Sequence, residues 1–174
     1  ERAAEKCRRV WGLGLDTPIT NMIRTLEWAG VIVTRLNFDG HAEKVDAFSR
    51  SGMRHVVVLN THKNSASRSV FDAAHECGHL VMHVGLETGT PALEEQAHQF
   101  ASAFLLPRVG FLREFPRFRS NIDWQVVFAL KARWRTSAAA IIRRSYDLKL
   151  IDAVLYQRAN RYLHYKGWDK GEPG

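Results

Sequence analysis

The stretch FDAAHECGHLVMH, from Phe71 to His83, decides how this chain is interpreted. It contains the pattern His-Glu-x-x-His, in which His75 and His79 are four residues apart. On a helix of 3.6 residues per turn, two such side chains project from one face and can hold one metal ion between them. Glu76 then lies beside that ion, where this motif uses its glutamate as a general base. The stretch therefore predicts a helix that carries half of a catalytic zinc site.

The residues around the motif favour this interpretation. Ser69 and Asp72 have the spacing of a capping box, which predicts a helix start just upstream of the motif. From Ser69 to Val84, only Asp72 and Glu76 carry a formal charge, so we expect the helix to be mostly buried. Buried histidine and glutamate side chains are costly unless they are paired or bound to metal. The alternative is a buried helix whose two histidines are simply hydrogen-bonded.

A catalytic zinc ion needs a third protein ligand and an open fourth position. His83 lies four residues beyond His79, but a rise of about 12 Å along the helix separates it from His75. We therefore expect His83 to support the site by packing or hydrogen bonding and not to bind the metal. A second helix is predicted between Thr90, a candidate N-cap, and Pro107, where the apolar pattern stops.

Two adjacent acids on this second helix compete for the role of third ligand. The apolar residues of the helix gather on one stripe: Leu93, Ala97, Phe100, Ala101 and Phe104. Glu94 falls about 70° from the middle of the stripe, whereas Glu95 points roughly the opposite way. Glu94 is therefore the predicted ligand, with a purely structural acid in the first helical turn as the alternative. His98, one turn further on, could orient a ligand through a hydrogen bond.

Several short segments follow one another in an order typical of one known family. After the zinc helix come Glu94-x-x-Ala97-x-x-Phe100-Ala101 and Leu105-Leu106-Pro107, with Trp11-Gly12-Leu13 upstream and Leu130-Lys131-x-Arg133-Trp134 downstream. On these segments the chain resembles the ImmA/IrrE family of bacterial metallo-endopeptidases over nearly its whole length. Gln96 and His98 stand where that family usually has Glu and Asn, and Cys77 replaces a common Leu. None of these departures removes a proposed ligand or the proposed base.

The resemblance implies a zinc-dependent endopeptidase of the bacterial cytoplasm. Its implied substrate is a helix-turn-helix repressor, whose cleavage switches on phage, mobile-element or stress genes. The residues themselves argue only for zinc-assisted hydrolysis, with Glu76 as the group that accepts and returns a proton. A donor for the developing oxyanion is also expected, and His83, His98, Tyr146 and several arginines are all candidates.

The order of the predicted elements indicates an α+β protein. Helices are predicted near Arg2–Val10, Thr20–Ala29, Asp123–Trp134, Ser137–Tyr146 and Ile151–Tyr165, and strands at Val31–Leu36, Val45–Ser49 and His55–Asn60. We expect a small, mostly antiparallel sheet packed on the zinc helix, followed by an all-helical part. The predicted domains are residues 1–115, zincin-like, and 116–174, helix-turn-helix-like. His55–Asn60 is a candidate edge strand for binding the substrate backbone, and an interior strand is the alternative.

The basic character of the chain supports a rival hypothesis. The formal net charge is +7, the isoelectric point is about 9.8, and Arg143 and Arg144 lie on the second helix of the predicted helix-turn-helix. A DNA-binding regulator with a non-catalytic zinc ion would have these features. However, that helix is largely Ala and Ile, which suits packing better than reading base edges. Structural zinc sites are also usually closed by four ligands and rich in Cys, unlike two His and one Glu.

Composition limits which other classes of protein remain possible. With 174 residues, 45% of them hydrophobic, the chain can bury a core as one domain with an appended subdomain. No apolar run approaches the length of a membrane span. Cys7 and Cys77 are far apart in the sequence, which indicates reduced thiols and a cytoplasmic protein.

Overall fold

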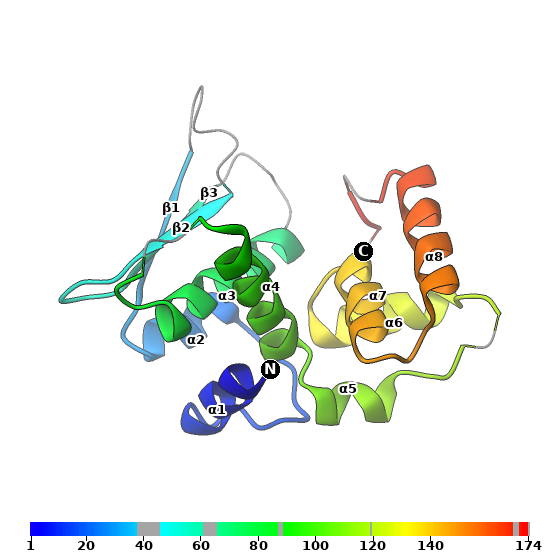
Figure 1. The fold of residues 1–174 in the computed structure, drawn as a ribbon, viewed down its shortest axis with the longest axis horizontal. Helices are drawn as coiled ribbons and strands as arrows, with labels where there is room; N and C mark the ends of the chain where they lie inside the picture. The colour runs from blue at the N-terminus through cyan, green and yellow to red at the C-terminus, as the bar shows by residue number, and fades with distance from the viewer. Residues whose placement is uncertain (38–45, 61–65, 87–88, 119, 169–170, 174) are drawn as a thin grey trace.

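A three-stranded sheet and the helices beneath it form one side of the molecule, and further helices form the other side (Figure 1). The computed structural model describes residues 1–37, 46–60, 66–86, 89–118, 120–168 and 171–173. Within these residues the elements are α1 (Arg2–Val10), α2 (Met22–Trp28), β1 (Ile32–Leu36), β2 (Ala47–Arg50), β3 (Val56–Asn60), α3 (Ala66–Met82), α4 (Pro91–Leu105), α5 (Arg108–Glu114), α6 (Trp124–Trp134), α7 (Ala138–Asp147) and α8 (Ala153–Tyr165). The α+β class is confirmed.

The strand order of the sheet is β1-β3-β2. β3 pairs in parallel with β1 and antiparallel with β2, so the sheet is mixed and not mostly antiparallel as expected. The prediction that His55–Asn60 is an edge strand is wrong, because β3 is the central strand and its residues Val57 to Asn60 are buried. β2 is the edge strand next to α3. Val45, the first residue of the predicted strand Val45–Ser49, lies outside the described residues.

α3 is the helix that carries the His-Glu-x-x-His motif, and it packs mainly on α4. It begins at Ala66, three residues before Ser69, so the predicted capping box does not mark its start. All residues from Ala73 to His79 are buried, as the lack of charge predicted. A Cβ on Gly78 would lie 3.1 Å from the ring of Phe100 on α4. This glycine therefore allows the close approach of the two helices that the site requires.

The N-terminal helix is tied to this core by a buried arginine. Arg8 is fully buried, and its guanidinium donates hydrogen bonds to the carbonyl oxygens of Gly14, Phe104, Leu13 and Thr17. Burial lowers the pKa of Arg8 to about 10, although Asp16 favours the charged form. One cationic side chain thus connects α1, the loop after it and the end of α4.

Cys7 and Cys77 also lie on these packed helices. Both thiols are buried and free, and the Cys77 thiol donates a hydrogen bond to the sulfur of Cys7. The cysteines are therefore neighbours in space although 70 positions separate them in the sequence.

The C-terminal helices follow the predicted boundaries within two residues, and each begins at a capping side chain: Asp123, Ser137 and Asp152. α5 was not predicted, because its seven residues are too few for a helical apolar pattern and Pro107 stands at its start. The boundary at residues 115 and 116 stays a prediction. Buried side chains from both sides of it belong to one hydrophobic cluster.

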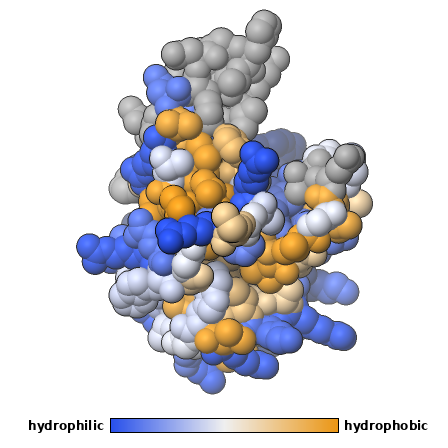
Figure 2. Space-filling model, turned by 90° about the vertical axis from the view of Figure 1, so that its left-hand side faces the viewer, coloured by the Kyte–Doolittle hydropathy of each residue, from blue (hydrophilic) through white to orange (hydrophobic). Residues whose placement is uncertain are grey.

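The surface of the molecule mixes polar and apolar side chains. On the face shown in Figure 2, apolar residues reach the surface between hydrophilic ones. Among the described residues, none of the helices combines the length and the apolar character that crossing a membrane requires.

Candidate metal centre

Three side chains from two helices converge at one point. His75 and His79 come from successive turns of α3, and Glu94 comes from the first turn of α4. Glu94 Oε2 lies 3.1 Å from His75 Nε2, Glu94 Oε1 lies 3.5 Å from His79 Nε2, and the two Nε2 atoms are 3.1 Å apart. One ligand atom from each residue lies within 4.8 Å of the others. The group can therefore hold one metal ion.

The protonation states of these residues suit metal binding. Burial, together with the neighbouring His98 and His79, lowers the pKa of His75 to about 4. Burial also lowers the pKa of His79. The pKa of Glu94 is lowered because His79 and His75 outweigh burial, which would raise it. Both imidazoles are therefore neutral and Glu94 is ionised near neutral pH, which is the state that metal ligands require.

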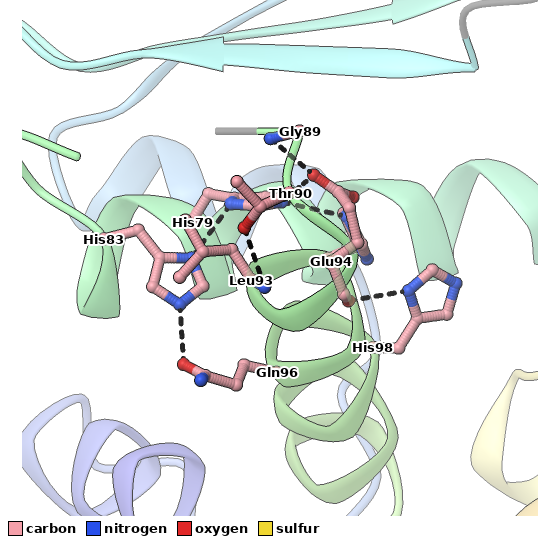
Figure 3. Close-up of polar contacts among 9 residues, drawn as sticks. His79, His83, Gly89, Thr90, Leu93, Glu94, Gln96 and His98 are labelled. Atoms are coloured by element: carbon pink, nitrogen blue, oxygen red, sulfur yellow. Dashed lines mark hydrogen bonds and ion pairs between the residues drawn. The ribbon is translucent and has the colours of Figure 1, made fainter. Parts of the chain in front are cut away.

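Glu94 is held in place from its far side. The backbone N–H of Gly89 donates to Glu94 Oε1 at 3.1 Å, and Thr90 accepts from the N–H of Leu93 to cap α4 (Figure 3). The sequence places Pro91 directly after Thr90, which favours a helix start at this point. The cap therefore fixes where on α4 the carboxylate of Glu94 projects.

His83 supports His79 through a chain of hydrogen bonds. His83 is 4% exposed, its Nδ1 lies 3.0 Å from His79 Nδ1, and its Nε2 lies 3.1 Å from Gln96 Oε1. Gln96 Oε1 can only accept, so Nε2 of His83 donates, and in neutral His83 the other nitrogen accepts from His79 Nδ1. His79 then carries its proton on Nδ1, and the lone pair on its Nε2 faces Glu94. Figure 3 shows His83 and Gln96 on one side of Glu94 and His98 on the other.

The hydrogen bonds from Gln96 through His83 to His79 lead to a testable prediction. Replacing His83 by Phe keeps the packing but removes the acceptor for His79, so we expect zinc affinity to fall by about 10- to 100-fold. Competition with a chromogenic chelator measures the affinity. The same substitution at His164, on α8, should leave the affinity unchanged. Equal zinc affinity of the His83→Phe variant and the unchanged protein would contradict the supporting role of His83.

Glu76 lies beside the three converging side chains but points to the sheet. Its side chain is hydrogen-bonded to Ser49 on β2, and the residue is 6% exposed. Burial is the main reason why the pKa of Glu76 is raised to about 7; the nearby Glu94 and Asp72 act in the same direction as burial, and the Ser49 hydrogen bond acts against it. A carboxyl group with a pKa near 7 can both take up and release a proton at neutral pH.

The raised pKa predicts how pH affects the metal-free protein. The folded state holds a proton on Glu76 up to about pH 7, whereas the ordinary pKa is 4.5. The stability from this group is therefore complete below pH 4.5 and is lost as pH rises through 7. As pH rises from 5 to 8, the unfolding free energy of Glu76→Gln should therefore increase by about 2–3 kcal/mol relative to that of the unchanged protein.

Urea unfolding of both chelator-treated proteins at the two pH values measures this difference. Buried neutral histidines such as His75 act in the opposite direction, because the unfolded chain takes up their protons first. Their contribution is common to both proteins and cancels in the comparison. A difference that does not change with pH would show that Glu76 is ionised throughout this range.

The three candidate ligands line a cavity of about 340 Å³, whose wall also includes Ser49, Glu76 and His98. His98 is exposed and packs edge-on against His75, with ring centroids 4.5 Å apart. Its Nδ1 is bonded to the backbone oxygen of Glu94 at 2.9 Å. Of the suggested oxyanion donors, His83 has both ring nitrogens engaged and Tyr146 stacks on Tyr156 in the C-terminal part. Of the three residues suggested by name, only His98 faces the cavity.

Sequence reasoning did not foresee two contributors to the site. Ser49 lies 27 positions before Glu76 and reaches it only because β2 is the edge strand beside α3. Gln96 was noted as a departure from the family pattern, and its contact with His83 gives that departure a structural role. His75 Nδ1 is buried and has no hydrogen-bond partner among the described residues.

Comparison with known proteins supports the interpretation of this geometry. The model of the IrrE N-terminal-like domain family, Peptidase_M78, matches residues 26–146. That range contains β1 to β3, the three converging side chains, Glu76 and all of α6. No curated protein is similar enough to the chain to count as a match. Because the family model covers more than half of the chain, the protein belongs to the IrrE N-terminal-like domain family and is, by that membership, of the metallopeptidase kind.

Proposed function

We propose that this protein is a zinc-dependent endopeptidase whose ligands are His75, His79 and Glu94 and whose general base is Glu76. The observation that carries the proposal is the meeting of two neutral imidazoles, one carboxylate and a buried carboxyl group in a single open cavity. Two nitrogen ligands and one oxygen ligand from the protein leave a position open, which is typical of catalytic zinc. A structural zinc site would be closed by a fourth protein ligand.

We assign three residues beside the metal ligands a part in the reaction: Glu76, Ser49 and His98. Bound zinc would polarise the scissile carbonyl and lower the pKa of a water molecule. Glu76 would accept the proton of the attacking water, and its pKa near 7 allows it to return that proton to the leaving amine. Ser49 holds the carboxyl group of Glu76 in position. His98 lines the cavity and is placed to contact the substrate.

β2 is the strand we propose for binding the substrate backbone. It lies at the edge of the sheet, and its residues Ala47, Phe48 and Ser49 line the cavity that contains the ligands. An extended peptide can add to such an edge through main-chain hydrogen bonds. Strand addition would carry the scissile bond past Glu76.

We further propose that the substrate is a helix-turn-helix repressor in the cytoplasm, so that cleavage derepresses phage, mobile-element or stress genes. The resemblance to the ImmA/IrrE family supports this choice. The reduced state of Cys7 and Cys77 agrees with a cytoplasmic protein.

Direct DNA binding has weaker support, although the net charge of +7 favours it. Arg144 is 4% exposed and bonds to Leu106 and Glu1, and Arg143 pairs with Asp147 and Glu95. Ala138, Ile141 and Ile142 of α7 are buried against the rest of the protein. α7 therefore serves as a packing helix and presents little that could read base edges.

Hydrolysis of a peptide mixture tests the proposal without knowledge of the natural substrate. We expect the zinc-loaded protein to cleave a defined set of synthetic peptides, as measured by mass spectrometry. A chelator should abolish cleavage by removing the metal, and added zinc should restore it. The Glu76→Gln variant, loaded with zinc in the same way, controls for a contaminating peptidase. Cleavage that survives the chelator would contradict a zinc-dependent mechanism.

A further inference from the structure

A second cavity, of about 270 Å³, adjoins the one that contains the metal ligands. The two cavities share Phe71 and His98, whose ring centroids are 5.7 Å apart. His98 in turn packs against the ligand His75. The second cavity therefore begins next to the metal ligands. We call it the α4–α7 cavity, because most of its wall comes from these helices, including Gln99, Ser102, Ala139, Ala140 and Arg143.

Several polar groups in this wall are already hydrogen-bonded or ion-paired. Gln99 donates to Glu95 at 3.0 Å, and the Ser137 hydroxyl accepts from the backbone N–H of Ala140 at 3.0 Å. Arg143 lies between two carboxylates, 2.9 Å from Asp147 and 3.7 Å from Glu95. An apolar group in the cavity would therefore leave few of these hydrogen bonds or charges without a partner. An acidic group would meet two carboxylates and a single cation that is already engaged.

The size of the cavity limits its occupant. Sites for small-molecule ligands usually measure about 300–1,000 Å³. At 270 Å³, with the Phe71 ring and the methyl groups of Ala139 and Ala140 in its wall, the cavity suits one side chain better than a whole ligand. The cavity lies beside the candidate metal ligands. A substrate side chain that enters it would therefore belong to a residue adjacent to the scissile bond.

We propose that the α4–α7 cavity is a specificity subsite that accepts an apolar side chain of the substrate next to the scissile bond. This inference rests on the proposed peptidase function. It also gives α7 a direct part in substrate selection, because Ala139, Ala140 and Arg143 of this helix line the subsite. The family match agrees with such a unit, since it continues through Tyr146 and thus includes nearly all of α7.

Three small hydroxamates can test the subsite without a natural substrate. The probes are succinyl hydroxamates with an N-methylamide end, one unsubstituted, one with an isobutyl group and one with a carboxymethyl group beside the amide. Calorimetric titration of the zinc-loaded full chain gives the affinity of each. We expect the isobutyl compound to bind about tenfold more tightly or better than the unsubstituted one. The carboxymethyl compound should show no gain.

Filling the cavity should remove this selectivity. In the Ala140→Phe variant, we expect the ratio of the isobutyl and unsubstituted affinities to fall to about one. Ala139→Phe, at a more exposed position of the same wall, provides a second variant if the first does not fold, as judged by circular dichroism and zinc content. Ala153→Phe, at an exposed position on α8 outside both cavities, should retain the full ratio.

The outcomes separate the subsite from the function on which it rests. If the unsubstituted hydroxamate binds but the isobutyl group adds nothing, the subsite is overturned and the metal site stands. The subsite is also overturned if the ratio persists in both filled variants. If the unsubstituted hydroxamate does not bind the zinc-loaded protein, the proposed catalytic metal site fails and the subsite with it.

Discussion

Replacing Glu76 by Gln is expected to reduce peptide hydrolysis by about 10²- to 10⁴-fold while zinc remains bound. Glutamine keeps the size of the side chain and can still hydrogen-bond to Ser49, but it cannot accept a proton. The loss should lie toward the upper end of the range, because Glu76 would act twice, first as the base and then as the acid. The measurement is kcat/KM on a peptide that the unchanged protein cleaves, together with zinc per chain by mass spectrometry.

The control for this variant is Glu27→Gln, at an exposed position on α2. It should retain both hydrolysis and zinc. Undiminished hydrolysis in Glu76→Gln would exclude Glu76 as the base. Loss of zinc together with hydrolysis would mean that the carboxyl group of Glu76 supports metal binding and not only the chemistry.

Glu94→Gln is expected to weaken zinc binding by more than about 100-fold. Removing a residue that merely orients a ligand costs about 10- to 100-fold in affinity, and Glu94 contributes a ligand atom itself. The carboxylate also supplies the negative charge that faces both imidazoles, at 3.1 and 3.5 Å. Chelator competition gives the affinity, and mass spectrometry gives the zinc content after purification.

The neighbouring acid offers a matched control for metal binding. Glu95→Gln makes the same chemical change one position along α4, on the side that faces Arg143. We expect Glu95→Gln to bind zinc like the unchanged protein. Equal zinc affinity of the Glu94 and Glu95 variants would remove Glu94 from the ligand set, and with it the proposed three-residue site.

The local part of the site could be predicted from the sequence because it depends on spacing along one helix. His75 and His79 lie about one turn apart on α3, with Glu76 between them, so helical geometry alone brings the two imidazoles together. The choice of Glu94 over Glu95 followed from the apolar stripe of α4, and the structure places Glu94 against both histidines. The burial of α3 followed from its lack of charged residues.

Relations between distant segments could not be predicted in this way. Short runs of β-branched and aromatic residues located the strands, but which strands pair depends on how the connecting segments cross the sheet. The sequence therefore gave no reason to place β2 beyond β3, and Ser49 beside Glu76 was not foreseen. The contact between Cys7 and Cys77 arises in the same way, from the packing of α1 against α3.

The sequence by itself predicted which three side chains converge, which glutamate lies beside them and where the C-terminal helices begin, because each follows from the spacing of side chains within one segment and from capping residues. Only the tertiary structure decided which strand borders the cavity, how His83 and Gln96 fix His79, and that the outer face of α4 meets α7. These features depend on the distance between segments remote in the chain. That distance is set by the close packing of the whole core, such as the approach of Gly78 to Phe100, which no short stretch of sequence specifies.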